Sequence, residues 1–167
     1  SGVGASWVYN RINGVWNQQG NKLVGTGSSN GGFQGKSVSL SADGNTAFVG
    51  GYTDNYAQGA TWVHTGISSI NANLSALTLS SGTLDPTFAT GTTAYTANVG
   101  NTTTGITVTP TQSEANATIE VRVNNGSYAS VTSGSASGSL SLNVGSNTID
   151  VKVTAQDGTT VKTYSIN

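Results

Sequence analysis

The six residues GASWVY at positions 4–9 return as GATWVH at positions 59–64, and this internal repeat decides how the first third of the chain is interpreted. The second copy begins 55 residues after the first. A period of about 50 residues that contains four short strands is typical of β-propeller blades and related arrays. Each unit of such an array buries its faces against a neighbour. The chain contains one period plus one strand. The sequence therefore predicts an incomplete repeat that needs further β-structure from outside itself.

Inside the repeat, short alternating apolar runs are bounded by Gly, Asn and Asp, which is typical of strands. Strands are predicted at residues 5–10, 15–19, 37–41 and 46–50. The dipeptide Asn13-Gly14 predicts a tight hairpin between the first two, and residues 42–45 (ADGN) predict a second turn. We expect these four strands to form one small sheet. The restarted strand at 59–64 either joins that sheet or pairs with a neighbour.

A family resemblance rests on three segments: Phe33-Gln34-Gly35, SVSLSADG at 37–44 and AFVGG at 47–51. On these residues, about 4–65 resembles an FG-GAP or integrin-alpha-type propeller repeat of the bacterial kind. The resemblance implies calcium binding in blades that carry an acidic D-x-D-x-D-G loop. Here the corresponding residues 41–45 (SADGN) contain a single carboxylate, so no calcium site is expected.

A new alternating pattern begins at Leu74. The predicted organisation is thus a blade-like unit at 1–66, a connector at 67–73 and a β-sandwich at 74–167. Seven sandwich strands are predicted, at 74–80, 94–99, 106–111, 117–123, 138–143, 147–155 and 159–166. Each strand has one apolar face. These faces form the predicted core, which comprises Leu77, Leu79, Tyr95, Val99, Ile106, Val108, Ile119, Val121, Val123, Leu140, Leu142, Ile149, Val151, Val153, Val161, Tyr164 and Ile166.

Three motifs of this second half carry another resemblance: Leu74-x-x-Leu77-x-Leu79, Gly145-x-Asn147-x-Ile149 and VTAQDG at 153–158. With them, nearly all of 74–167 resembles the bacterial cadherin-like β-sandwich domain. The resemblance implies a spacer or adhesion module on a large secreted protein. Calcium ligation at the domain junction would need clustered acidic residues, and the connector has none.

The composition excludes several classes of function. Charged residues are only 8% of the chain and the net charge is −1, so no electrostatic field attracts nucleic acid. Apolar runs are too short for membrane insertion. Cysteine is absent, which excludes disulfides and thiolate metal sites. A surface of hydroxyls and amides indicates an extracellular or cell-surface protein.

Candidate catalytic residues are few. His64 is the only histidine of the chain and has no acidic residue near it in the sequence, so it is interpreted as a strand residue in place of the aromatic Tyr9. The aspartates are scattered singly through turns, connectors and strands. The chain is predicted to be no enzyme, with no cofactor and no bound metal.

Aromatic residues concentrate in the first unit. Because equivalent positions of a repeat pack between neighbouring units, the candidate self-association residues are Trp7, Tyr9, Trp62, Val63 and His64. Exposed loop aromatics have less reason to pack. The candidate ligand or partner contacts are therefore Tyr52, Tyr56 and Trp16, with glycans as the ligand class.

Three functions stay open at this point. The preferred one is a structural or adhesion subunit that assembles with other copies of itself into a ring or a filament, with the sandwich as spacer or surface decoration. The second is a C-terminal fragment of a large secreted propeller-containing adhesin. The third is a carbohydrate-binding, lectin-like module.

Overall fold

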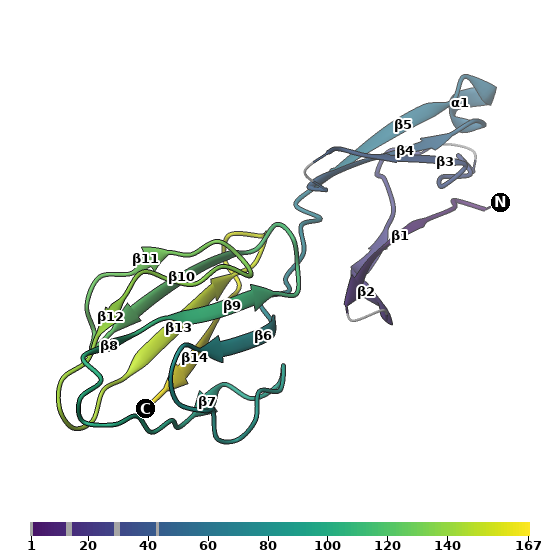
Figure 1. Ribbon diagram of the computed structural model, residues 1–167. Coiled ribbons are helices and arrows are strands. Elements are labelled where there is room, and N and C mark those ends of the chain that lie inside the picture. The colour runs from purple at the N-terminus through teal and green to yellow at the C-terminus, as the bar shows by residue number, and fades with distance from the viewer. Residues whose placement is uncertain (1, 13–14, 29–30, 43) are drawn as a thin grey trace. The chain divides into compact units, whose positions relative to one another are not determined.

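The computed structural model describes residues 2–12, 15–28, 31–42 and 44–167. The fold is all-β apart from one short helix, and the chain divides into two compact units, Ser1–Ser69 and Ile70–Asn167 (Figure 1). Each unit has its own sheets. We call them the N-terminal unit and the sandwich.

The N-terminal unit contains two separate sheets among its described residues. Strands β1 (Ser6–Ile12) and β2 (Val15–Leu23) form an antiparallel pair. Strands β3 (Ser37–Leu40), β4 (Thr46–Gly51) and β5 (Ala60–Thr65) form an antiparallel sheet in the order β3-β4-β5. The four-residue helix α1 (Asp54–Ala57) connects β4 to β5.

The prediction of one four-stranded sheet is therefore wrong. The second edge of β4 is taken by the restarted strand β5, whereas β1 and β2 pair with each other. Alternation along a strand predicts that a strand forms but not which edge its neighbour will take. Both hairpin predictions concern turns, Asn13-Gly14 and 42–45, that lie wholly or partly outside the described residues.

The core of the N-terminal unit is small. Of the apolar side chains described in this unit, only those of Ala47 and Val49 are buried, and both belong to the central strand β4. Sheets of two and three strands have few side chains to bury, so this unit leaves much apolar surface in contact with solvent.

The sandwich is built on the five-stranded sheet β11-β10-β13-β14-β7. Its strands are β10 (Thr118–Val123), β11 (Ala129–Ser130), β13 (Ile149–Thr154), β14 (Val161–Ile166) and β7 (Ala94–Tyr95), the last parallel to β14. Two strand pairs complete it. They are β6 (Leu74–Leu79) with β9 (Val108–Gln112) and β8 (Gly105–Ile106) with β12 (Leu140–Ser141).

The described sandwich has nine strands where seven were predicted. The predicted strand 106–111 divides at Thr107, where the chain leaves β12 for β6. Ser80 forms hydrogen bonds with both backbone groups of Thr107. Its Oγ accepts a hydrogen bond from the Thr107 N–H at 2.9 Å, and its N–H donates to the Thr107 carbonyl oxygen at 3.0 Å. Strand β11 is only two residues long and has no apolar alternation that would predict it.

The predicted apolar faces form most of the sandwich core, and Leu74, Pro110 and Ala117 add to it. Val161 is the exception, because its side chain is 51% exposed. It shares its face of β14 with Thr163 and Ser165, while Tyr164 and Ile166 occupy the buried face. The prediction that Val161 belongs to the core was therefore wrong, because Val161 lies on the opposite face of β14 from Tyr164 and Ile166.

Candidate association surface

Large exposed apolar side chains gather in the N-terminal unit. Of those in the described part of the chain, all but Ile70, Val144 and Val161 belong to it. They are Val3, Trp7, Tyr9, Val15, Trp16, Val24, Phe33, Val38, Leu40, Phe48, Tyr52, Tyr56 and Val63. Apolar surface that is concentrated in this way marks interaction sites in soluble proteins.

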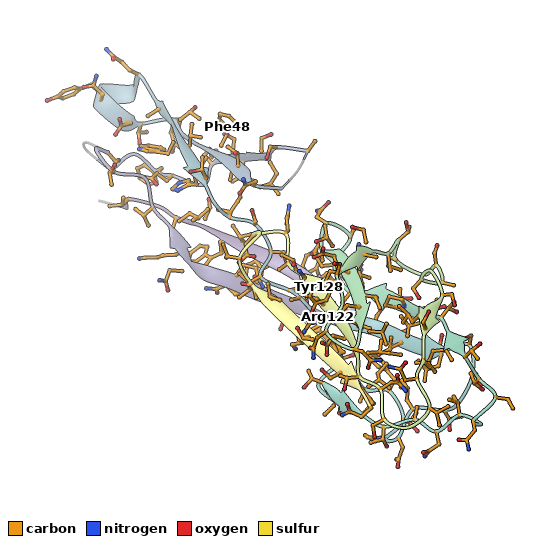
Figure 2. The ribbon with its side chains drawn as sticks, turned by 90° about the vertical axis from the view of Figure 1, so that its left-hand side faces the viewer. Phe48, Arg122 and Tyr128 are labelled. Atoms are coloured by element: carbon orange, nitrogen blue, oxygen red, sulfur yellow. The ribbon has the colours of Figure 1, made fainter. Side chains whose placement is uncertain are left out.

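One face of the sheet β3-β4-β5 exposes a directly opposed apolar pair. Phe48 on β4 pairs with Val63 on β5, and the two side chains are 45% and 56% exposed. Figure 2 marks Phe48 on this sheet. Val38 and Leu40 are exposed on the opposite face of the edge strand β3. None of these three residues of β3 and β4 was predicted from the sequence as a contact residue, although apolar residues on both faces of 46–49 were a signal for Phe48.

Trp62 lies against residues 25 and 26, in the glycine-rich loop between β2 and β3. Its Nε1 donates to the Thr26 carbonyl oxygen at 3.0 Å. A Cβ added at Gly25 would lie 2.0 Å from the indole ring, and one at Gly51 would lie 2.9 Å from it. The glycines therefore let the backbone approach the ring, and Trp62 fills part of the small interior of this unit.

Gln34 fixes the same loop. Its side chain is buried and pairs with both backbone groups of Gly25: Oε1 accepts the N–H at 2.6 Å and Nε2 donates to the carbonyl oxygen at 3.0 Å. The Gln34 N–H donates to the Val3 carbonyl oxygen at 2.9 Å. This one residue thus connects Gly25 to the segment that precedes β1.

The structure separates the predicted self-association residues into two groups. Trp7 and Tyr9 are half-exposed on β1, whereas Trp62, Val63 and His64 belong to β5. The Nε2 atom of His64 is buried and has no hydrogen-bond partner within the described residues. A buried nitrogen without a hydrogen bond lowers the stability of the fold, so a hydrogen-bond partner for this atom would be stabilising.

The predicted ligand contacts do not form one cluster of stacked rings. The Tyr52 ring stacks on Phe33 with centroids 5.8 Å apart, and the Lys36 ammonium lies 5.7 Å from the Tyr52 centroid. Tyr56, in α1, is 86% exposed. Trp16 belongs to β2, where the Arg11 guanidinium lies 5.9 Å from its ring.

The sandwich has a charged face that was not predicted from the sequence. Arg122 pairs with Asp150 at 2.8 Å and Lys152 with Glu120 at 2.6 Å, across the neighbouring strands β10 and β13. The Tyr128 ring lies beside both cations, 4.6 Å from the Arg122 guanidinium carbon and 4.2 Å from the Lys152 ammonium (Figure 2). The signal was the alternation of charges at two-residue spacing on both strands. Because each charge has a partner on the same face, this cluster has a structural explanation.

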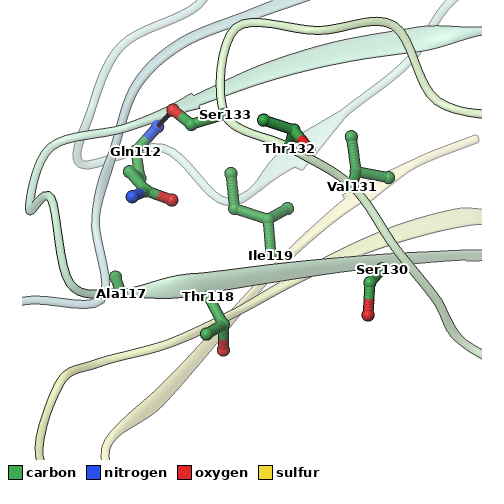
Figure 3. Close-up of a pocket in the computed structure, with 8 residues that line it drawn as sticks. All are labelled: Gln112, Ala117, Thr118, Ile119, Ser130, Val131, Thr132 and Ser133. Carbon is green, nitrogen blue, oxygen red and sulfur yellow. Dashed lines mark hydrogen bonds between the residues drawn. The ribbon is translucent and has the colours of Figure 1, made fainter.

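A pocket of about 370 Å³ opens beside β10 (Figure 3). It is lined by Gln112, Ala117, Thr118, Ile119, Ser130, Val131, Thr132 and Ser133. None of these eight side chains titrates near neutral pH, so the pocket offers no general acid or base.

Across the described ranges, no three His, Asp or Glu side chains come close enough together to hold a metal ion. No helix in that part of the chain has the length and hydropathy to span a membrane.

The comparison with family models concerns the sandwich. A family model described as "Cadherin-like beta sandwich domain" matches residues 74–167. A protein of Evansella cellulosilytica named "Putative membrane protein" is 39% identical over 93 residues, which are 56% of this chain and 13% of that protein. The chain thus spans a small part of this relative's length. No solved structure matches the chain.

Proposed function

Because the chain belongs to the cadherin-like β-sandwich family through residues 74–167, we propose that it is a non-catalytic structural or adhesion module of the cell exterior. In this proposal the N-terminal unit associates with other copies of the chain, as a propeller-like repeat does with its neighbours. The sandwich acts as spacer or surface decoration. Domains of this family are typical of extracellular and cell-surface proteins.

One observation carries the association. The sandwich closes a core of fully buried side chains such as Leu74, Val108 and Val151, whereas the N-terminal unit exposes most of its large apolar side chains. Burial of apolar surface is the main force in protein association, at roughly 25 cal/mol for each Å² removed from water. The N-terminal unit therefore gains stability when a second protein surface covers it.

The absence of catalysis is part of the same proposal. His64 is half-buried on β5, and its register partner across the sheet is Ala47. A general base needs a substrate within hydrogen-bond reach and a group that orients it. The chemistry of this strand supports packing better than proton transfer.

Light scattering after size-exclusion chromatography tests the association. We expect the full chain at micromolar concentration to have a larger mass than one chain. Substitution of Phe48→Thr or Val63→Thr removes apolar surface from the exposed pair and should move the protein toward the monomer. Val144→Thr is the matched control, since Val144 is 82% exposed but lies in the sandwich. A well-folded monomer across the whole range would contradict the proposal.

A second candidate is that these residues are one part of a larger surface adhesin. The similarity to a relative of which the chain covers only 13% favours it. In that case further copies of the GASWV period should be encoded next to this sequence, in the same reading frame. Sequencing the flanking gene decides this, and a flanking sequence without the period would count against it.

A further inference from the structure

We propose that the outer edge of β5 binds strand β2 of a second copy of the chain, in the register that β2 has on β1. This inference rests on the proposed self-association and names the strands that form it. The completed sheet would have the order β3-β4-β5-β2, with β2 contributed by the partner chain.

The internal repeat identifies the missing strand. The sequences of β1 and β5 are equivalent, since GASWVY returns as GATWVH. Yet the two copies have different partners, because β1 pairs with β2 and β5 pairs with β4. Combining the two pairings on one strand gives a four-stranded antiparallel meander. Each copy of the chain thus contains both halves of the meander, but in separate sheets.

The hydrogen-bonding direction of β5 shows which edge is open. The Ser41 N–H donates to the Thr46 carbonyl oxygen at 2.9 Å, so Thr46 directs its backbone groups toward β3. Successive residues of a strand direct these groups to opposite edges. Ala47 therefore points toward β5, where it lies opposite His64. It follows that His64 uses its backbone groups on β4, and that those of its neighbour Val63 point to the outer edge.

On β1, the corresponding edge is the one that β2 occupies. The Val3 carbonyl oxygen accepts the Gln34 N–H, and a Cβ added at Gly35 would lie 2.6 Å from the Ala5 carbonyl oxygen. Val3 and Ala5, which precede β1, thus direct their backbone groups toward residues 34 and 35. The register of β1 and β2 shifts between Ser6 and Val8, so the edge that Val8 uses is taken from the pairs beyond the shift. Ile12 lies opposite Val15, with only two residues between them in the chain, and such a closing pair is hydrogen-bonded, so alternation makes Val8 direct its backbone groups toward β2 as well.

Val8 is the repeat equivalent of Val63, so β2 binds on β1 the same edge that is open on β5. The proposed contact therefore continues a pairing that the chain already contains. Transferring its register places Gln19 opposite Val63, Gln18 opposite His64 and Asn17 opposite Thr65.

An independent observation agrees with this register. The buried Nε2 of His64 has no hydrogen-bond partner within the described residues. Side chains directly opposite each other on neighbouring strands lie on the same face of the sheet. The amide of the incoming Gln18 would therefore lie on the same face of the sheet as the imidazole, where rotation of the His64 ring would bring Nε2 to a hydrogen-bond partner.

Transfer of β2 from β1 to the β5 of a second copy moves it from a smaller sheet into a larger and more stable one. A two-stranded pair is marginally stable in water, whereas three or more strands with an apolar face are stable. On β1, strand β2 belongs to a two-stranded sheet; on β5 it becomes the fourth strand. Every copy offers one acceptor edge and one donor strand. Contacts of this head-to-tail kind extend into rings or filaments.

Disulfide trapping between two full-length variants tests the proposal. Because the sequence contains no cysteine, only the introduced cysteines can form a disulfide. One variant carries Asn17→Cys and the other Thr65→Cys, and both side chains are exposed. The control mixture combines Gln18→Cys with Thr65→Cys, which is one residue out of register and on the opposite face. Because disulfides require Cα atoms at about 4.4–6.8 Å, the in-register heterodimer should form about tenfold faster than the control.

Four outcomes would overturn the inference. Equal rates for both mixtures would show no preferred register. A double variant, Asn17→Cys with Thr65→Cys, that crosslinks only within single chains would show that the chain's own β2 fills the edge. Association by light scattering without the in-register heterodimer would refute this edge and leave the proposed function standing, whereas a monomer would refute both.

Discussion

At the scale of single residues, the sandwich depends on polar groups that are satisfied deep in an apolar core. The Tyr164 side chain is fully buried, yet its hydroxyl oxygen accepts the Leu74 N–H at 2.9 Å, and its proton is directed to the Thr90 carbonyl oxygen at 3.3 Å. Burial raises the pKa of Tyr164, since the charged phenolate would lose hydration there. One hydroxyl thus connects the start of β6 to the last strand.

Substitution of Tyr164→Phe should lower the free energy of unfolding of the sandwich by about 1–3 kcal/mol, because the Leu74 N–H loses its partner in a buried position. Urea unfolding, monitored through the hydrogen exchange of the sandwich amides, measures this loss of stability. The matched control is Tyr56→Phe, at a tyrosine that is 86% exposed, and it should leave stability unchanged. An equal loss in the control would contradict the role of the buried hydroxyl.

Asp157 makes the turn before β14 sensitive to acid. The Thr160 hydroxyl and N–H and the Thr159 N–H all donate to its carboxylate, and these bonds hold the pKa of Asp157 far below its usual range. A carboxyl whose pKa is lower in the folded state stabilises the fold above its unfolded pKa, and the contribution is lost as pH falls toward the folded value. The stability of the wild type should therefore decline below about pH 4.

Asp157→Asn keeps one acceptor oxygen and removes the charge, so its stability should depend less on pH between about 5 and 2. Thermal unfolding at a series of pH values compares the two proteins. Identical pH profiles would show that this carboxylate does not contribute to acid sensitivity.

At the scale of elements, the packing of β5 depends on a glycine of the segment between β2 and β3. Gly25→Ala would place a Cβ 2.0 Å from the Trp62 ring and should displace the indole from Thr26. Overpacking of this kind costs about 1–3 kcal/mol. Faster amide exchange in β5 and a change in tryptophan fluorescence are expected. Gly138→Ala, where an added Cβ meets nothing within 4 Å, should change neither.

Sequence reasoning was more successful for strands than for their partners. Alternation predicted the positions of β1, β3, β4 and β13 to within a few residues, because a strand with one buried face repeats every second residue. It failed where alternation has no information. Strand β11 is too short to have a period, and the division at Thr107 depends on the hydroxyl of a distant serine.

The candidate surface shows the same limit. Trp62, Val63 and His64 were selected by repetition, and the structure places them on one strand. The open edge beside them follows from pairings that no local pattern contains, since it depends on which strand β4 accepts. The charged face at Arg122 and Asp150 also needed the register of two strands that are distant in sequence.

At the scale of the whole molecule, the two units differ in how their stability arises. The sandwich contains a continuous cluster of buried side chains, while the N-terminal unit has a minimal interior. Local stability follows buried apolar contacts, and regions with few of them open at low free energy. The two units should therefore unfold as separate cooperative units, with the N-terminal unit opening first and gaining stability with protein concentration.

Val151→Ala separates these contributions, because Val151 is fully buried at the centre of the sandwich sheet. The lost methyl groups and the resulting cavity should lower the stability of the sandwich by about 2 kcal/mol. Hydrogen exchange of the full chain should show faster exchange at β10, β13 and β14 and unchanged exchange at β3, β4 and β5. Raising the protein concentration should do the reverse, protecting β5 while leaving the sandwich amides as they were. If the substitution instead accelerated exchange equally in both units, the chain would be one cooperative unit, and the separate stability of the two units would be refuted.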